Sequence, residues 1–189
     1  TNICVLMKNK IHKYDFLIVG AGLIGTLTAL ALKQKKFKVL VIDNKNDTSI
    51  DKRTLAVNAN SKDFLKKLGI WKMLKSKPQP IDKIIIKDYI NTNPLIFRNT
   101  NESMGNVIFN SELIKIALAK LENLKILNKN VNLNMDELLP NKTISISKRK
   151  FQFKKIVLGL GKNITSNSLF ESITFDNGHY SYVGFFNHN

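Results

Sequence analysis

The sequence predicts an α/β fold with a parallel sheet, because an apolar strand, a glycine-rich turn, a helix and a second apolar strand follow one another directly. The first strand is Phe16–Val19, which is apolar throughout, as strands of a buried parallel sheet are. A helix is predicted over Thr26–Lys35 and the second strand over Lys38–Ile42. This alternation is typical of parallel strands joined by a crossover helix.

The turn between the first strand and the helix has the G-x-G-x-x-G pattern of dinucleotide-binding sites. Its six residues are Gly20, Ala21, Gly22, Leu23, Ile24 and Gly25. In this pattern the first glycine allows the tight turn, the second lets the backbone approach a pyrophosphate, and the third lets helix and strand pack closely. The N-terminus of the following helix attracts phosphate. We therefore expect these six residues to bind a dinucleotide cofactor.

Asp43 completes this unit. It ends the second strand eighteen residues after Gly25, where a carboxylate can accept hydrogen bonds from ribose hydroxyls. A glycine turn alone is a weak sign, since such turns also occur without a ligand. Here the preceding strand, the following helix and the acid agree, so the sequence predicts a Rossmann-like nucleotide site.

The uncharged segment Phe16–Leu32, with lysines on both sides, also suits a signal peptide or a membrane anchor. Its seventeen residues fall just short of a comfortable membrane span. Three glycines dilute its hydrophobicity, and Asp15 stands at its start. Strand and helix explain the segment better.

The 189 residues include one cysteine and three scattered histidines. One cysteine excludes a disulfide framework and a cysteine-rich metal site, and it suits a reducing cytoplasm. The histidines lack the paired spacing of zinc ligands, so the sequence argues against a zinc enzyme. The length suits one domain and part of another.

The formal net charge of +16 suggests nucleic acid or an anionic membrane as a partner. Lysines supply nearly all of it and are spread along the chain, with Arg53, Arg98 and Arg149 as the arginines. Aromatic residues are not interleaved with basic ones as a single-strand binder requires. We expect no nucleic-acid partner, and a solvated lysine surface compatible with peripheral association at the inner membrane.

Downstream, the pattern predicts two further helices and five strands. The helices are Asn60–Leu68, ended by Gly69, and Ser111–Leu121. The strands are Ile84–Ile86, Leu95–Phe97, Leu124–Leu127, Thr143–Ser147 and Phe151–Leu160, the last apolar enough to lie centrally in the parallel sheet. Residues 1–14 are expected to have no regular secondary structure, and the prolines of Lys77–Pro80 are expected to interrupt the chain between two elements.

Two motifs follow the nucleotide unit, D-K-R-T-L-A at Asp51–Ala56 and L-G-I-W at Leu68–Trp71. In this order and spacing the chain resembles the flavin-dependent aromatic hydroxylases of ubiquinone biosynthesis, the polyprenyl-phenol hydroxylases of the para-hydroxybenzoate-hydroxylase-like group. Val57 stands where the family has Leu. The resemblance covers Tyr14 to Tyr182.

The resemblance implies an enzyme that uses FAD, with NAD(P)H as reductant and a polyprenyl-phenol as substrate. It places Gly20, Gly22 and Gly25 at the pyrophosphate and Asp43 at the adenosine ribose, where the family usually has Glu. Arg53 would pair with cofactor phosphate or ribose oxygens; a surface salt bridge with Asp51 is the alternative. We expect no acid–base or nucleophilic catalyst in this chain.

In fold terms, the resemblance implies a Rossmann-like FAD-binding domain from residues 1–80 and 105–172. Residues 81–104 and 173–189 would belong to an incomplete β-rich substrate domain.

The chain departs from the family at a second motif, Asp-Gly followed by Ser and Arg. Leu160 replaces the Asp, Ile164 the Ser and Asn167 the Arg, and Gly161 alone is kept. The sequence also stops at Asn189, directly after the stretch Tyr180–Phe186, which in the family begins the substrate-binding sheet. We therefore expect a truncated or split form with little activity alone. Two alternatives stay open: a non-catalytic partner of a separate C-terminal chain, and another FAD- or NAD-dependent oxidoreductase.

Overall fold

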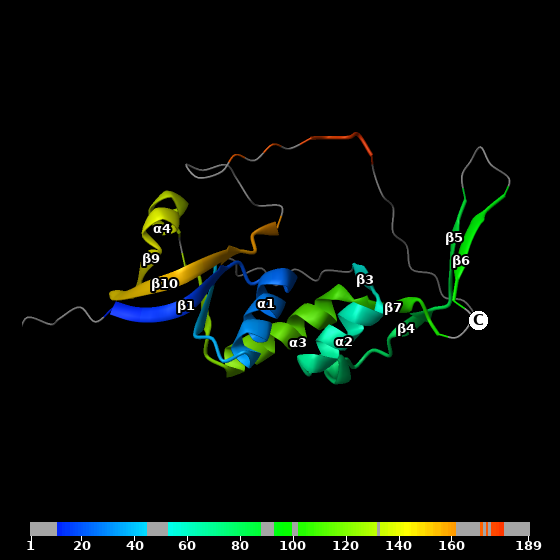
Figure 1. The fold of residues 1–189 in the computed structure, drawn as a ribbon, viewed down its shortest axis with the longest axis horizontal. Coiled ribbons are helices and arrows are strands. Elements are labelled where there is room, and N and C mark those ends of the chain that lie inside the picture. Colours follow the sequence, from blue (N-terminus) through cyan, green and yellow to red (C-terminus); the bar gives the residue numbers. More distant parts are fainter. Residues whose placement is uncertain are drawn as a thin grey trace, which may run out of the picture. The chain divides into compact units, whose positions relative to one another are not determined.

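The computed structural model describes residues 11–44, 53–87, 93–99, 102–131, 133–161, 171, 173 and 175–179. Most of its helices and strands are labelled in Figure 1. The chain divides into two compact units. Unit 1 comprises residues 1–47 and 121–189, and unit 2 comprises residues 48–120. The predicted boundaries of the FAD-binding and substrate domains stay a prediction.

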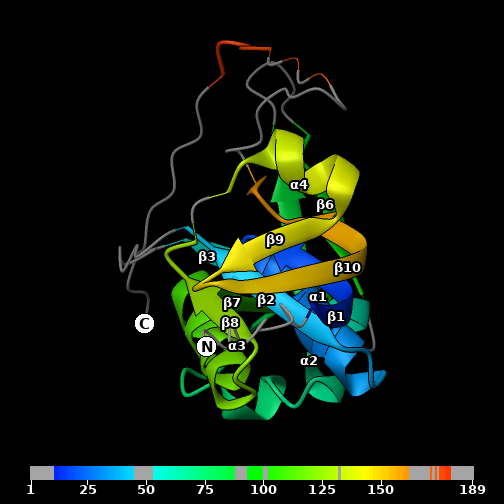
Figure 2. The same cartoon turned by 90° about the vertical axis from the view of Figure 1, so that its left-hand side faces the viewer.

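Unit 1 is built on a five-stranded sheet with the order β8-β2-β1-β10-β9. Its strands are β1 (Ile11–Val19), β2 (Val39–Asp43), β8 (Leu127–Lys129), β9 (Thr143–Ile146) and β10 (Arg149–Leu158). The first four in this order are parallel, and β9 is antiparallel to β10. Figure 2 shows β9 and β10 as neighbouring strands, with α4 beside them. The predicted α/β fold with a parallel sheet is confirmed.

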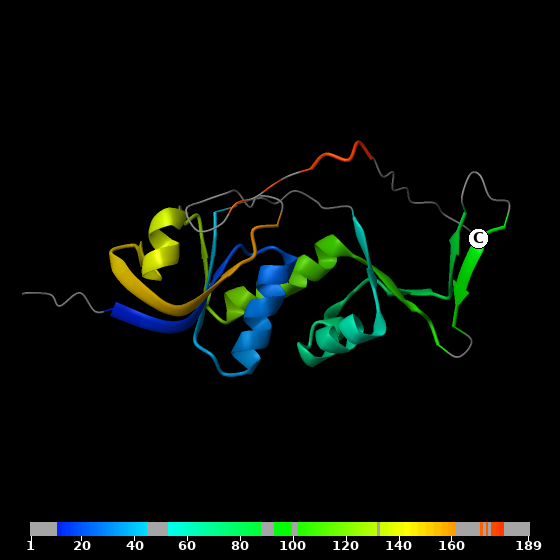
Figure 3. The same cartoon turned by 45° about the horizontal axis from the view of Figure 1, so that its top comes forward.

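The register brings the carboxyl ends of the three central strands together. Val19 at the end of β1 lies opposite Ile42 on one side and Leu158 on the other. Helix α1 (Leu23–Gln34) follows β1 at this edge and contacts β2, as Figure 3 shows for the blue helix. The core of the sheet contains Leu17, Val19, Leu40, Ile42, Val131, Leu138 and Phe153. Open α/β sheets bind ligands at this carboxyl edge.

Three elements of unit 1 differ from the expectation. The strand predicted over Leu124–Leu127 is displaced, because Leu124 lies in the turn after α3 and β8 spans Leu127–Lys129. Residues 11–14 were expected to be irregular, but this is wrong, because β1 begins at Ile11, which pairs with Lys150 of β10. Tyr14 supports this extension with ring contacts to Phe151 and Phe153 at 5.9 and 6.0 Å. Helix α4 (Met135–Asn141) was not expected, since it has seven residues and contains Pro140.

Unit 2 contains a three-stranded antiparallel sheet with the order β3-β7-β4. Its strands are β3 (Thr54–Val57), β4 (Gln79–Ile81) and β7 (Gly105–Phe109). The expected break at Lys77–Pro80 is wrong for its last residues, because Pro80 lies in β4 opposite Asn106. An edge strand such as β4 tolerates proline, since the missing N–H faces away from the ladder.

The helices of unit 2 confirm the predicted ones. Helix α2 (Ala59–Lys67) begins after Asn58, whose side chain accepts the N–H of Ser61 at 2.9 Å. Its C-cap is Leu68, and the next residue, Gly69, has a φ of 67°. There the Ile70 N–H donates to the Leu65 carbonyl at 2.9 Å, as in a Schellman end. A short 3-10 helix, η1 (Trp71–Met73), follows, and helix α3 spans Asn110–Asn123.

Unit 2 also contains the two-stranded hairpin of β5 (Lys83–Ile86) and β6 (Leu95–Arg98). Ile84 pairs with Phe97, and Ile85 pairs with Ile96. Every residue of both strands is exposed. The six apolar side chains, which are 42 to 56% exposed, are Ile84, Ile85, Ile86, Leu95, Ile96 and Phe97. The predicted strands exist, but they bury no apolar face in the described structure.

Candidate nucleotide-binding site

The glycine turn begins at Gly20, directly after β1. Gly20 has a φ of 100°, a conformation that favours glycine, and its N–H donates to the Ile42 carbonyl at 2.8 Å. A Cβ added at Gly20 would lie 2.5 Å from the carbonyl oxygen of Gly159. Both the backbone angle and the close approach therefore require glycine at this position.

Gly25 joins helix and strand. A Cβ at Gly25 would lie 2.0 Å from the carbonyl oxygen of Gly20 and 3.3 Å from Cγ2 of Ile18. The first turn of α1 can therefore approach the end of β1 only because the side chain is absent. This contact is the close helix–strand packing that the third glycine of the motif allows.

Gly22 differs from these two glycines, because space is open around it. It is the N-cap of α1, with φ −66° and ψ −178°, and no side chain caps the helix there. A Cβ at Gly22 would meet no atom within 4 Å. The first N–H groups of a helix have no partner within the helix. The first turn of α1 contains no acidic residue, so the turn presents N–H donors and a positive dipole end to an anion.

Leu23 and Ile24 form the start of α1 next to this opening. Leu23 is half-buried, whereas the side chain of Ile24 is 71% exposed. Their backbone N–H groups, not their side chains, are suited to a phosphate.

The peptide groups around Ala21 are fixed on both sides. The Ala21 N–H donates to Oδ2 of Asp43 at 2.6 Å, and the Ala21 carbonyl accepts the hydroxyl of Thr26 at 2.9 Å. Thr26 is fully buried. Asp43 thus lies at the carboxyl end of β2 as predicted, and it also orders the turn itself. A charge-assisted bond of this kind is stronger than a neutral one.

Two residues that hold this turn in place, Thr26 directly after it and Gly159 beside it, were not predicted from the sequence. Thr26 follows the last glycine of the motif directly, and this position was its only signal. Gly159 follows β10; its N–H donates to the Val19 carbonyl at 2.7 Å, and a Cβ there would lie 3.2 Å from Cα of Gly25. A glycine at the end of an apolar strand was the available signal.

Arg53 belongs to unit 2 and precedes β3. It is exposed, and its carbonyl accepts the Asn110 N–H at 3.0 Å. Asp51, the alternative ion-pair partner, lies outside the described residues. A role of Arg53 at the cofactor stays a prediction.

The second family motif is described only at its start. Leu160 is half-buried, and Gly161 has a φ of 59°. Ile164 and Asn167 lie outside the described residues, as does Tyr180–Phe186. The apolar Leu160 side chain cannot accept a hydrogen bond, and its place at a departure from the family motif stays a prediction.

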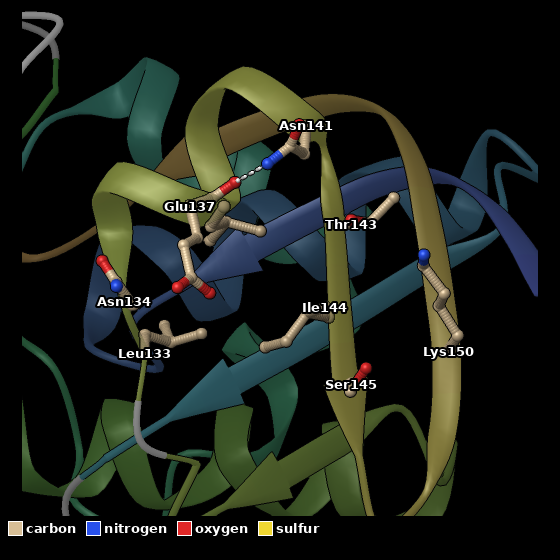
Figure 4. Close-up of a pocket in the computed structure, with 9 residues that line it drawn as sticks. Leu133, Asn134, Glu137, Asn141, Thr143, Ile144, Ser145 and Lys150 are labelled. Atoms are coloured by element: carbon tan, nitrogen blue, oxygen red, sulfur yellow. Dashed lines mark hydrogen bonds between the residues drawn. The ribbon is translucent and has the colours of Figure 1, made fainter.

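A cavity of about 360 Å³ lies between α4 and the strands β9 and β10. Figure 4 shows the Glu137 side chain in it, while the Asn141 amide donates to the Glu137 carbonyl at 2.9 Å. Asn134 accepts the Asp136 N–H at 3.1 Å. Both Asn side chains therefore stabilise α4 itself. Lys150, at the start of β10, places the cavity away from the carboxyl edge, where ligands of such sheets bind.

The described part of the chain lacks two other kinds of feature. It contains no group of three or more His, Cys, Asp or Glu side chains that could hold a metal ion. None of its helices combines the length and the apolarity that a membrane span requires.

Comparison with known proteins identifies the family. The FAD binding domain family matches residues 13–136, which is more than half of the chain. The chain belongs to this family. The matched region contains the glycine turn, Asp43 and Arg53, so the nucleotide that the turn is suited to is FAD.

Curated relatives support this assignment. The chain is 28% identical over 140 residues to the ubiquinone biosynthesis monooxygenase COQ6 of Caenorhabditis elegans, covering 66% of this chain and 31% of the relative. It is 35% identical over 79 residues to the ubiquinone hydroxylase UbiL of Rhodospirillum rubrum, covering 39% and 18%. The chain thus spans about a third or less of the length of these relatives. The predicted resemblance to ubiquinone-pathway hydroxylases is confirmed.

Solved structures show the same fold. The p-nitrophenol 4-monooxygenase PnpA of Pseudomonas putida has a TM-score of 0.56 at 14% identity, over 78% of this chain and 41% of that one. The flavin-dependent monooxygenase PieE, solved with FAD and substrate, has a TM-score of 0.54 at 15% identity, over 76% and 29%. The Rossmann-like FAD-binding fold is therefore confirmed.

The geometry of the turn fits the ADP half of FAD. Open space at Gly22 and the N-terminus of α1 suit the pyrophosphate, and Asp43 lies at the strand end that faces an adenosine ribose in such folds.

Proposed function

We propose that this chain is the FAD-binding part of an NAD(P)H-using aromatic monooxygenase that hydroxylates a polyprenylated phenol in ubiquinone biosynthesis. The observation that carries the proposal is the open backbone at Gly22, at an uncapped helix N-terminus in a turn that is otherwise tightly packed. The family match supports FAD, and the names of the relatives support a monooxygenase of ubiquinone biosynthesis.

Each predicted site residue has one task in this proposal. The backbone from Gly20 to Gly25, including Ala21, Leu23 and Ile24, holds the pyrophosphate. Asp43 accepts hydrogen bonds from the adenosine ribose, and Arg53 pairs with a phosphate or ribose oxygen. When bound, the flavin supplies the redox chemistry that links NAD(P)H oxidation to hydroxylation of the phenol. The protein orients the cofactor and excludes water.

We further propose that the chain alone holds only the ADP half of FAD and has little monooxygenase activity. Leu160 supports this, since it cannot accept the hydrogen bond that the family's carboxylate accepts at this position. Steady NADPH oxidation coupled to phenol hydroxylation by the purified 189 residues would contradict this part of the proposal.

FAD binding tests the site. Quenching of FAD fluorescence by the purified chain should give a micromolar affinity that Gly22→Val lowers about tenfold or more, because the side chain fills the space for the phosphates. The variant should fold, since a Cβ at Gly22 meets no atom within 4 Å. Thr28→Val is the control, because it places the same valine side chain within α1 but outside the turn, where it replaces a side chain of similar size.

Competition by fragments of the cofactor sharpens this test. ADP should displace FAD, whereas riboflavin should not, if only the ADP half is held. A folded chain that binds no FAD, or a Gly22→Val variant that binds it as the wild type does, would show that the turn is not the cofactor site.

A second candidate function is supported by the hairpin β5–β6. Its six apolar side chains are 42 to 56% exposed, and such a patch is typical of a surface that another polypeptide covers. In this reading the chain is a non-catalytic partner of a separate chain that carries the C-terminal half. Co-purification of the two after co-expression, with loss on Ile85→Lys, would support it.

A further inference from the structure

A lysine-rich segment belongs to unit 2, whereas the glycine turn belongs to unit 1. Between residues 62 and 77 the chain has six lysines, no arginine and one acid, Asp63. The lysines are Lys62, Lys66, Lys67, Lys72, Lys75 and Lys77, and all except the half-buried Lys62 are exposed. They belong to α2, to η1 and to the segment that follows. We call residues 62–77 the basic face.

Apolar side chains are exposed among these lysines. Leu65 and Leu68 are only 3% exposed and anchor α2 in its unit, whereas Phe64 and Met73 are 40% and 44% exposed. Trp71 is half-buried, and the ammonium of Lys62 lies 5.3 Å from the centre of its ring. The basic face therefore combines cations with exposed apolar groups.

Two acids, Asp63 and Glu112, lie near the six lysines of the basic face. Asp63 pairs with Lys66 at 3.0 Å, and both side chains are more than half exposed, so this pair is weak. The Glu112 carboxylate accepts the backbone N–H groups of Lys75 and Ser76. It therefore fixes the segment that carries Lys75 and Lys77 by binding its backbone, without pairing with either ammonium group in the described contacts.

We propose that the basic face is a docking surface for anionic lipid headgroups. Clustered lysines are attracted to the negative surface potential of a membrane, and each contributes to binding near that surface. Exposed apolar side chains such as Phe64 and Met73 add affinity by entering the headgroup boundary. This surface goes beyond the proposed function and does not depend on cofactor binding.

The composition of the basic face favours lipid over nucleic acid. Single-strand binders stack bases on open aromatic rings and use arginine for additional contacts. The basic face has no arginine, and its Trp71 ring is already in contact with Lys62. Phe64 is its one exposed aromatic side chain.

A second lysine group, at the end of α1 in unit 1, serves as the matched control. Lys33, Lys35 and Lys36 lie there, but the neighbouring Phe37 packs edge-on against Phe16, with ring centres 5.2 Å apart. This group has three lysines where the basic face has six, and although Phe37 is 41% exposed, its ring packs against Phe16.

Vesicle co-sedimentation of the 189-residue chain tests the proposal. Vesicles of phosphatidylcholine and phosphatidylglycerol in equal amounts should bind the chain, and vesicles of phosphatidylcholine alone should not. The triple variant Lys72→Gln/Lys75→Gln/Lys77→Gln should lower the partition coefficient about tenfold or more. The control Lys33→Gln/Lys35→Gln/Lys36→Gln should lower it no more than about twofold, which is the effect of net charge alone.

A second pair of variants tests the apolar part. Phe64→Gln/Met73→Gln should weaken binding most at high salt, where charge attraction is screened, and Leu124→Gln, an exposed apolar residue of unit 1, should not. Equal losses in the two lysine variants, binding to neutral vesicles, or tighter binding to single-stranded RNA than to anionic vesicles would overturn the proposal. FAD titration of the same variants should be unchanged, so failure of this inference leaves the nucleotide site intact.

Discussion

The glycine turn of unit 1 and the hairpin β5–β6 of unit 2 are opposites in how they are stabilised. In the turn, Gly20, Gly25 and Gly159 allow backbone contacts that any Cβ would crowd, and Asp43 and Thr26 fix the peptide groups around Ala21. In the hairpin every side chain is exposed, and two cations, Lys83 and Arg98, lie opposite each other. Like charges in such a pair are destabilising.

This difference separates a region that contacts within its own unit stabilise from a region whose apolar side chains have no covering layer in the described structure. The printed contacts that order the turn all come from unit 1, so this unit specifies the conformation of the turn by itself. The hairpin has two apolar faces without a layer over them in the described structure. An isolated two-stranded sheet has only marginal stability in water. We therefore expect the hairpin to be more stable when another polypeptide surface covers its apolar side chains.

The largest expected effect distinguishes two glycines within the turn. Gly25→Ala should destabilise the chain by about 3 kcal/mol, because its Cβ would lie 2.0 Å from the Gly20 carbonyl oxygen, which is backbone and cannot rotate away. Gly22→Ala should cost about 1 kcal/mol or less, since only the N-cap preference changes. Urea unfolding followed by circular dichroism measures both. Similar losses in the two variants would contradict the geometry of the turn.

The turn could be predicted from the sequence because its determinants are local. Residues Phe16 to Asp43 contain both strands, the three glycines and the acid within one continuous stretch. The clamp by Thr26 and the packing of Gly159 could not be predicted in this way. The first depends on the rotamer of one hydroxyl group, and the second on which distant strand lies beside β1.

The limits of β1 and the existence of α4 illustrate the same point. Ile11 is a strand residue only because Lys150 lies opposite it, and a pattern search within a short window cannot detect this pairing. Helix α4 is short and contains Pro140, so its propensity is low; its Asn134 N-cap and buried Leu138 stabilise it. Arg53 lies in the other unit, so its contribution to the site stays a prediction.

A smaller effect compares isoleucines in the two regions. Ile18→Thr should cost about 2 kcal/mol, because Ile18 is fully buried beneath the turn and the variant buries a hydroxyl. Ile85→Thr should cost less than about 0.5 kcal/mol, because Ile85 is already 44% exposed. Ile108→Thr, at 5% exposure in unit 2, is the control within the same unit and should resemble Ile18→Thr. A large loss for Ile85→Thr would show that the hairpin is buried in solution, for example by self-association.

The smallest expected effect on stability concerns the ion pair between Asp15 of β1 and Lys154 of β10. The ammonium of Lys154 bonds to Oδ1 of Asp15 at 2.7 Å, and the Lys38 N–H bonds to its other oxygen at 2.9 Å. These bonds, that of Lys154 first, hold the pKa of Asp15 below its ordinary value of 3.8. A carboxylate whose pKa is lowered on folding stabilises the fold above its ordinary value. This contribution is lost as the pH falls through the lowered pKa.

Asp15→Asn should therefore lower Tm slightly at neutral pH and leave it unchanged below the lowered pKa. The difference in Tm between wild type and variant should shrink as the pH falls below 3.8, and differential scanning calorimetry at several pH values measures it. Because the pair is exposed, added salt should reduce the difference at neutral pH. Salt should have the opposite effect on the hairpin, where it screens the repulsion between Lys83 and Arg98. A difference in Tm that persists at low pH would mean that Asp15 stabilises β1 by its shape or packing, and that the sheet under the turn does not depend on this charge.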